Sequence, residues 1–527
     1  MLPSMFRRFY PRACDNRLPL SHPEVRVNRV KFFKAASLNF VLLLLLFFGL
    51  FCYMFGSLYQ EESRTNNLDI LWVDYDGGII GDAVRDAYKS LQSNSFPTLV
   101  ERPALEFPSE SDLREVVCNT NYWAALYTFP RSSESLGLAI AGSDASQYNP
   151  SHILSYIWNE ARYPTVMDSL ISSNLRALSD GARVAYTALN GTAAFSTIPP
   201  NNPAAISAFA TPWTLSSINI QPTTQGPRTV YNTIVIVLVL IQDFFYLGAI
   251  NGLYVQFKIY TRITPTRIIL VRDVLSGTFT MVGSLLITCA IWAFRANWNV
   301  SGTQFALNWL ILWLFAHANF LTLDVFTIWI PPQYISMALI SWVVINVTSI
   351  ILPFDLSSPF YRWGYALPAH AAYDALTDNW SNGCSPHLYY ALPVLFAYEL
   401  SGLFWTSLGV YKRCHYAVIT EETTQEAMRL RVEATLKLER EHDRRLGQEH
   451  IEESVREDEN GESSRADKNA ADFIQKARKD KEGEEADRLQ AEKDIEELGD
   501  EIERMETRAT RMANFGPSFH LVGEEME

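Results

Sequence analysis

The chain has 527 residues with 58 acidic and 44 basic side chains, and 48% of its residues are hydrophobic. From residue 415 onward, 32 acidic and 18 basic residues account for the whole net charge of −14, which leaves 26 residues of each sign in residues 1–414. The chain is too long for one compact soluble domain. Its basic residues do not outnumber its acidic residues, which argues against nucleic acid as a partner.

The first predicted element is a membrane-spanning helix at residues 37–59. This apolar stretch has no charged residue and is long enough to cross the hydrocarbon core of a bilayer. It is longer than the apolar core of a cleaved signal peptide, so we interpret it as an uncleaved signal anchor. Eight lysines and arginines lie in residues 1–36, and Glu61 and Glu62 follow the span. Because basic flanks stay in the cytoplasm, residues 1–36 are predicted to be cytoplasmic.

Residues 60–228 are predicted to form an extracytoplasmic domain of α/β or α+β type. The domain opens with ILWVDYDGGII, in which a strand runs into Asp74, Asp76 and two glycines. A phosphatase nucleophile of this pattern needs a second carboxylate cluster for magnesium, and a calcium loop needs carboxylates spread over about 12 residues. The sequence offers neither, so we predict a strand, a turn capped by the Asp side chains and an amphipathic helix. No catalytic residue, metal ligand or cofactor is assigned.

Two later patterns complete this domain. The stretch CNTNYWAALYTFP at residues 118–130 predicts a strand after a turn. The spacing of Ile153, Tyr156 and Ile157 predicts a helix, and a second apolar set from Met167 to Leu178 predicts another.

Five further spans are predicted in a membrane domain at residues 229–414. Alternation of sides places Lys258, Arg262, Arg267 and Arg272 in a cytoplasmic loop and Arg413 in the cytoplasm, which agrees with the positive-inside rule. The approximate bounds of these spans are 230–257, 274–294, 304–323, 334–352 and 388–411.

Sequons and cysteines give a second view of the same topology. Three sequons, at Asn190, Asn299 and Asn379, are predicted outside the cytosol as glycosylation sites, whereas the sequon at Asn346 lies within a span. Of the six cysteines, only Cys118 and Cys384 are predicted to lie outside. In an oxidising compartment these two are expected to form a disulfide.

Polar residues inside the spans are the candidate substrate-binding residues: Asp243, His317, Asn319 and Glu399. A charge in hydrocarbon costs about 2.5–3.5 kcal/mol even on the lenient insertion scale, so these residues are expected to face one another or a wet cavity. The alternative is that the carboxyls are protonated and only join helices by hydrogen bonds.

The acidic residues 415–527 are predicted to be a cytoplasmic tail. Within it, residues 491–512 carry apolar side chains three and four positions apart over about three heptads, which predicts a short coiled coil. The alternative is a solvated, partly helical tail.

Three stretches carry a resemblance to a known family. They are VDYDGG at 73–78, NYWAALYTFP at 121–130 and SSPFYRWGYALPAHAAYDALTDNW at 357–380. Over residues 25–416 the chain resembles the fungal nitrosoguanidine-resistance membrane proteins. That family in turn resembles the type-2 permease half of ABC exporters and the bacterial phage-infection-protein group.

The resemblance implies an α-helical polytopic protein with one helix, an inserted outer domain and five more helices. It also implies a re-entrant or interfacial element, rich in proline and aromatic residues, between the last two helices. The implied role is drug or mutagen resistance at the plasma membrane, through the organisation of lipids.

The sequence lacks the motif with which the chain itself could use ATP to drive transport. No glycine is followed by lysine, so the chain has no Walker A phosphate loop. Three alternatives follow: a separate ATPase drives transport, another gradient drives it, or the protein does not pump at all.

We therefore expect a non-enzymatic, permease-like protein with both termini in the cytoplasm, at the plasma membrane or, as the alternative, in an endomembrane. It would export or redistribute lipid-like or amphiphilic compounds, with membrane lipids and amphiphilic small molecules as partners. The alternative from another class is a scaffold that acts through a tail-binding protein; a homo-oligomer is compatible with both.

Overall fold

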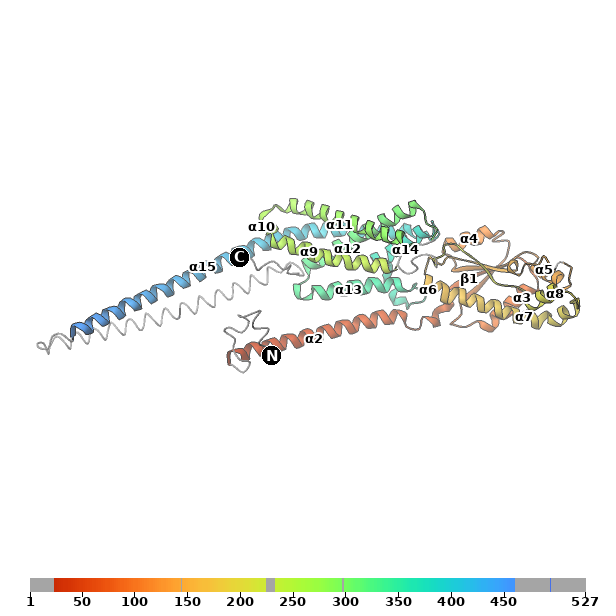
Figure 1. Cartoon of the computed structure of the whole chain (residues 1–527), viewed down its shortest axis with the longest axis horizontal. Coiled ribbons are helices and arrows are strands. Elements are labelled where there is room, and N and C mark those ends of the chain that lie inside the picture. The colour runs from red at the N-terminus through yellow and green to blue at the C-terminus, as the bar shows by residue number, and fades with distance from the viewer. Residues whose placement is uncertain (1–22, 144, 224–232, 296–297, 460–492, 494–527) are drawn as a thin grey trace. The chain divides into compact units, whose positions relative to one another are not determined.

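A computed structural model describes residues 23–143, 145–223, 233–295 and 298–459 and residue 493. The described chain is mostly helical, with six helices long and apolar enough to cross a membrane and one five-stranded sheet (Figure 1). It divides into two compact units. The first comprises Met1–Ile241, Met281–Asn319 and Ser336–Tyr398, and the second comprises Gln242–Thr280, Phe320–Ile335 and Glu399–Glu527.

The sheet belongs to the first unit, and its three central strands are buried on both faces. Its strands are β1 (Asp69–Asp74), β2 (Thr98–Arg102), β3 (Ala124–Thr128), β4 (Leu154–Trp158) and β5 (Ser216–Asn219), in the order β2-β1-β3-β4-β5. Only the β3–β4 pair is antiparallel. Ile70 and Trp72 lie in one apolar core and Leu71 and Val73 in another, which explains why β1 reads as a continuous apolar run.

Helices of the first unit cover this sheet. They are α3 (Ile79–Leu91), α4 (Glu110–Cys118), α5 (Ser132–Ile140), α6 (Pro164–Val166), α7 (Ser173–Thr197) and α8 (Pro203–Ala210). Short 3₁₀ turns occupy Glu62–Asn67 and Pro150–His152, and a π-helical turn, η4 (Met167–Ser172), leads into α7. Helix α3 packs along α7. The domain is thus a mixed α/β fold.

The predicted strand, turn and helix at the start of this domain are confirmed. Asp74 Oδ1 accepts hydrogen bonds from the backbone N–H groups of Asp76, at 3.1 Å, and Gly77, at 3.0 Å. Asp74 also pairs with Arg85, 2.9 Å away. These partners account for the carboxylate as a turn-capping group.

The helix predicted from Ile153, Tyr156 and Ile157 is wrong. These residues lead into and form part of β4, whose five residues are all buried. A mostly apolar run also places apolar residues three and four positions apart, so the spacing does not distinguish a buried strand from a helix.

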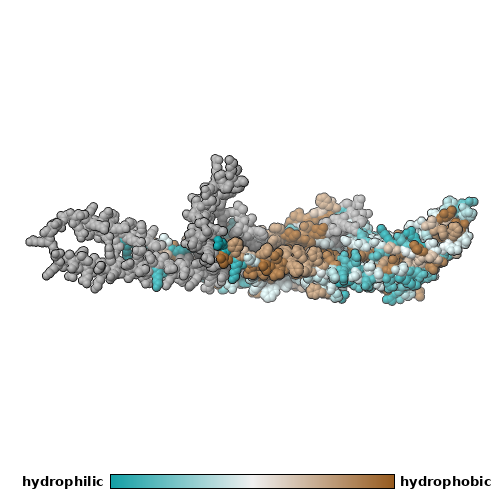
Figure 2. Space-filling model, turned by 90° about the horizontal axis from the view of Figure 1, so that it is seen from below, coloured by the Kyte–Doolittle hydropathy of each residue, from teal (hydrophilic) through white to brown (hydrophobic). Residues whose placement is uncertain are grey.

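Within the described residues, all six predicted spans are helical. The helices are α2 (Pro23–Leu58), α9 (Val235–Gln256), α11 (Pro265–Ala293), α12 (Gly302–Trp329), α13 (Pro332–Ile351) and α15 (Leu388–Glu459). Figure 2 shows hydrophobic side chains gathered on the helical part, and Phe48, Leu238 and Leu286 are among the exposed apolar residues there. Such an apolar exterior suits contact with lipid chains.

The bounds of α11 and α12 differ from the prediction at two charged residues. Helix α11 begins at Pro265 rather than near residue 274, so Arg272 lies inside it and not in the predicted loop. Helix α12 continues past Leu323 to Trp329 and so includes Asp324. The short helix α10 (Ile259–Arg262) and a few linking residues connect α9 to α11.

The proline-rich element that the resemblance implies forms two short helices after α13. These are η6 (Pro359–Ala366) and α14 (Pro368–Trp380). Phe360, Trp363 and Tyr365 are exposed. Aromatic side chains in this setting suit a membrane interface.

The last helix crosses a predicted domain boundary. Helix α15 is continuous for 72 residues, so the structure has no break at residues 414–415. The predicted coiled coil at 491–512 lies outside the described residues, except for residue 493.

Candidate functional site

A charged pair is buried among the helices of the second unit. Arg272 of α11 and Asp324 of α12 meet through two hydrogen bonds, Nε to Oδ2 at 3.0 Å and Nη2 to Oδ1 at 2.6 Å. Their side chains are 3% and 1% exposed. A planar guanidinium matched to a carboxylate in this way is the strongest common form of ion pair.

A second arginine joins this pair from α15. Arg413 donates from Nη2 to Asp324 Oδ1 at 3.1 Å and to Thr327 Oγ1 at 2.7 Å. The Tyr260 hydroxyl oxygen accepts from Nη1 of Arg413 at 3.3 Å and from Nη1 of Arg272 at 3.5 Å. One tyrosine therefore lies between the two guanidinium groups.

Asn251 completes what we call the arginine network, namely Asn251, Tyr260, Arg272, Asp324, Thr327 and Arg413. Asn251 Oδ1 accepts from Arg272 Nη2 at 2.8 Å. With two arginines and one aspartate, the network carries a formal charge of +1. Buried ions are costly unless they are paired and hydrogen-bonded, and within membrane spans they mark functional positions.

A pocket of about 430 Å³ adjoins the network. Tyr254 and Tyr260 belong to its lining, and their rings lie 5.5 Å apart. The Arg272 guanidinium carbon lies 5.4 Å from the centre of the Tyr254 ring. The remaining described lining residues are Val255, Lys258, Thr261, Ala417, Thr420, Glu421, Thr424, Gln425 and Met428.

Tyr254 has an unusual position in this pocket. Its side chain is buried, at 5% exposure, yet its hydroxyl has no hydrogen-bond partner among the described residues. A buried polar group without a partner costs about 1–3 kcal/mol, so the Tyr254 hydroxyl is a destabilising feature of the pocket wall.

The four residues that the sequence singled out are divided between the units. Asp243 on α9 is buried, at 1% exposure, and belongs to the second unit together with Glu399, which is half-buried on α15. His317 and Asn319 belong to the first unit. Asn319 accepts a hydrogen bond from Trp342 Nε1 at 2.9 Å, which gives it a packing role.

The sequence reasoning missed Arg272, Asp324 and Arg413 because each lies at or just beyond a predicted span end. One signal could have found Asp324: the apolar run VFTIWI resumes directly after it, which is typical of a helix that continues.

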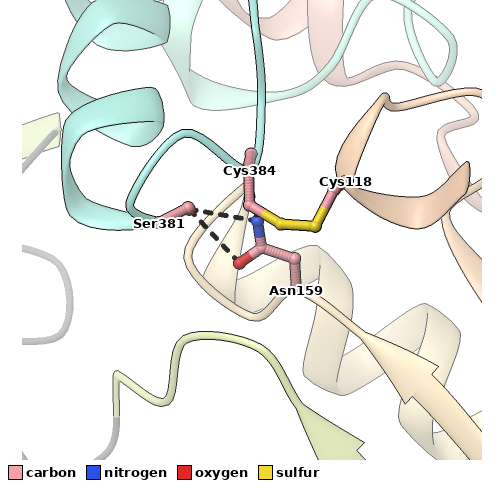
Figure 3. The surroundings of a disulfide bond; sticks show 4 residues. All are labelled: Cys118, Asn159, Ser381 and Cys384. Atoms are coloured by element: carbon pink, nitrogen blue, oxygen red, sulfur yellow. Dashed lines mark hydrogen bonds between the residues drawn. A yellow bond between two sulfur atoms is a disulfide. The ribbon is translucent and has the colours of Figure 1, made fainter. Parts of the chain in front are cut away.

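The first unit has its own polar junction, shown in Figure 3. A disulfide joins Cys118, at the end of α4, to Cys384, in the segment before α15. Beside it, Asn159 Nδ2 donates to Ser381 Oγ at 3.0 Å and to the carbonyl oxygen of Cys384 at 2.9 Å. This junction ties the sheet domain to the segment that follows α14.

The sequons differ in accessibility. Asn379 is 8% exposed on α14, and its Nδ2, the atom that would carry a glycan, donates to the Gln304 carbonyl at 2.9 Å. A glycan at Asn379 would require this buried side chain to give up that hydrogen bond. Asn299 is exposed, Asn190 is half-buried on α7, and Asn346 is fully buried within α13.

Among the described residues, no group of three or more His, Cys, Asp or Glu side chains could hold a metal ion.

Known proteins resemble this chain in sequence. The uncharacterized endoplasmic reticulum membrane protein YJR015W of Saccharomyces cerevisiae is 24% identical over 276 residues, which cover 49% of this chain and 53% of that protein. The chain thus spans about half the length of this curated relative. No solved structure matches. The profile described as protein of unknown function (DUF3533) matches residues 39–404, well over half of the sequence. The chain therefore belongs to the DUF3533 family of membrane proteins, whose function is unknown.

Proposed function

We propose that this protein binds lipid-like, amphiphilic molecules and redistributes them in its membrane. The pocket beside the arginine network carries this proposal. Its volume of about 430 Å³ falls in the range of ligand sites, about 300–1,000 Å³. Its lining mixes apolar side chains such as Val255 and Met428 with the polar Lys258 and Glu421. A ligand with one apolar and one polar part matches this lining.

The pocket lies at the helix ends that the positive-inside rule assigns to the cytosol. Lys258, Arg262 and Arg267 are at this end, at the close of α9, in α10 and at the start of α11. Basic residues at this level attract anionic groups of the cytoplasmic leaflet. On this basis the sheet domain lies outside the cytosol, and the ligand enters from the inner leaflet.

Two membranes are candidates for the site of action. The resemblance to the nitrosoguanidine-resistance proteins favours the plasma membrane and a part in drug or mutagen resistance. The name of the yeast relative favours the endoplasmic reticulum. Fractionation of cells that express the tagged full chain separates the two locations.

Redistribution can be measured in liposomes that contain the purified full chain and a phospholipid with a fluorescent acyl chain. Bleaching by external dithionite then reports how fast lipid from the inner leaflet becomes accessible. We expect the wild-type chain to accelerate this step over protein-free liposomes. A rate equal to that of protein-free liposomes would overturn the proposal.

A matched pair of variants ties the activity to the pocket. Val255→Trp would fill the lining and should abolish the acceleration. Phe257→Trp changes an exposed residue outside the described lining and should leave it intact. If both variants lost the acceleration equally, or if neither lost it, the activity would not depend on the pocket.

A scaffold remains the second candidate, because α15 continues to Glu459, well beyond a membrane span. A helix of this length could hold a cytosolic partner. Deletion of residues 429–527 removes the extended part of α15 and retains every described pocket residue. A redistributing protein should keep its activity after this deletion, whereas a scaffold should lose its cellular phenotype.

A further inference from the structure

The polar groups of the pocket are sorted into acceptors and donors. Three threonine hydroxyls in the lining already donate to backbone carbonyls: Thr261 to Lys258 at 3.1 Å, Thr420 to Tyr416 at 2.8 Å and Thr424 to Thr420 at 2.7 Å. A hydroxyl has one hydrogen, so these three oxygens can only accept further hydrogen bonds.

The Glu421 carboxylate adds a fourth acceptor group on the same helix as Thr420 and Thr424. Together, Glu421 and the three threonines form what we call the acceptor wall. A primary ammonium has three N–H donors and one positive charge. The wall therefore matches an ammonium in both hydrogen bonding and charge.

Lys258 is the cationic donor in the lining, and the Gln425 amide can both donate and accept hydrogen bonds. Lys258 Nζ lies 3.6 Å from a Glu421 oxygen, which is beyond hydrogen-bond distance. Both side chains are well exposed, at 58% and 38%, and a pair of this kind contributes little to stability. A ligand can replace it at small cost.

A phosphate and an ammonium on one ligand would satisfy both sets of groups. The phosphate would take Lys258, beside a network with a formal charge of +1. The ammonium would take the acceptor wall, Glu421 included. We propose that the pocket binds the head group of an aminophospholipid, of the phosphoethanolamine class, with the first part of its apolar portion along Val255 and Met428.

Other head groups fit less well. A phosphate without an amine leaves the Glu421 carboxylate facing an anion. A quaternary ammonium keeps the positive charge but has no N–H, so the threonine oxygens gain no hydrogen bond. The site should therefore prefer phosphatidylethanolamine to phosphatidic acid and to phosphatidylcholine.

This inference names the ligand class for the proposed function and rests on that function for what binding achieves. It is tested by native mass spectrometry of the full chain in detergent, with each of the three lipids added in turn. We expect phosphatidylethanolamine to be retained most strongly. Equal retention of phosphatidylcholine, or stronger retention of phosphatidic acid, would overturn the assignment.

Charge variants identify the groups involved. Glu421→Gln should weaken phosphatidylethanolamine binding about tenfold to hundredfold, the effect of one lost charge-assisted hydrogen bond, and should not weaken phosphatidic acid binding. Lys258→Met should weaken the binding of both lipids. Glu422→Gln, which removes the same charge next to the pocket but outside its described lining, is the matched control and should change nothing.

Competition by a soluble compound tests whether the ligand is a membrane lipid or a free metabolite. Glycerophosphoethanolamine carries the same polar groups without acyl chains and should compete only weakly. If it bound as tightly as the lipid, a membrane lipid as the ligand would be excluded.

The two proposals can fail separately. Redistribution in liposomes with no preference among the three lipids would retain the proposed function and overturn the head-group assignment. Selective binding of phosphatidylethanolamine without any redistribution would retain the head-group assignment and overturn the proposed function.

Discussion

Arg272 and Asp324, which are 52 positions apart in the sequence, form a two-point hydrogen-bonded pair that joins α11 to α12 within the second unit. Arg413 binds the same carboxylate from α15. A single aspartate thus compensates two buried arginines. Loss of that carboxylate would leave two like charges close together with no ion-pair partner among the described residues.

The first prediction concerns this aspartate. Asp324→Asn should destabilise the chain by about 3–5 kcal/mol, the usual result of removing one partner from a buried ion pair. The measurement is the thermal midpoint of the detergent-purified protein. Asp82→Asn, at a side chain that is 68% exposed, is the control and should have almost no effect. A midpoint equal to that of the control would show that the network does not stabilise the fold.

The second prediction concerns the disulfide between Cys118 and Cys384. Mapping of peptides under non-reducing conditions should recover the two cysteines in one cross-linked species. The bond spans 266 residues, and on the loop-entropy model closing so long a loop contributes about 4–5 kcal/mol, although measured values are often lower. Cys118→Ser should therefore lower the thermal midpoint, whereas Cys52→Ser, at an exposed free thiol, should not. Recovery of both thiols as free would contradict the pairing.

The third prediction concerns pH. Burial raises the pKa of the Asp378 carboxyl to about 6. The folded state then holds the proton more tightly than the unfolded chain, whose Asp has a pKa near 3.9, so stability falls as the pH rises from about 4 to about 6. Asp378→Asn removes this titration. We expect a higher thermal midpoint than that of the wild type above about pH 6, and a flatter profile below it.

The control for this pH effect is again Asp82→Asn, which should keep the wild-type profile. A wild-type stability that is constant between about pH 4 and pH 6 would contradict the raised pKa of Asp378.

The fourth prediction concerns glycans and topology. Digestion with a peptide N-glycosidase, followed by mass spectrometry, should find glycans on Asn299, on Asn190 or on both. Neither Asn346 nor Asn379 should be modified, because both side chains are buried. Protease treatment of sealed vesicles should remove the acidic tail from the cytosolic side only. A glycan on Asn346, or a protected tail, would contradict the topology.

The fifth prediction concerns proton coupling. Asp243 is buried within a candidate span, and the sequence offers no Walker A motif as a source of energy. Asp243→Asn preserves the shape of the side chain and removes its titration, so it should abolish redistribution and any resistance phenotype at normal abundance. Glu399→Gln should have the same effect or a smaller one. Full activity in both variants would make these carboxyls structural and leave a partner ATPase or the scaffold as the alternatives.

The sequence by itself determined the six spans, the strand, turn and helix around Asp74, and the two cysteines that the fold pairs. These are local or compositional properties. A long apolar run identifies a span whatever surrounds it, and an Asp before two glycines caps its own turn.

Only the tertiary structure decided which charges meet. Arg272, Asp324 and Arg413 lie on three different helices, and each looked like a residue at a span end until the helices were seen to continue. The strand β4 is buried on both faces, and apolar spacing in the sequence does not reveal which faces of an element are covered. Asn379 is buried as well, and a sequon does not reveal whether its amide is already hydrogen-bonded. The pocket, too, exists only where the ends of α9 and α10 meet α15, since its lining residues lie far apart in the chain.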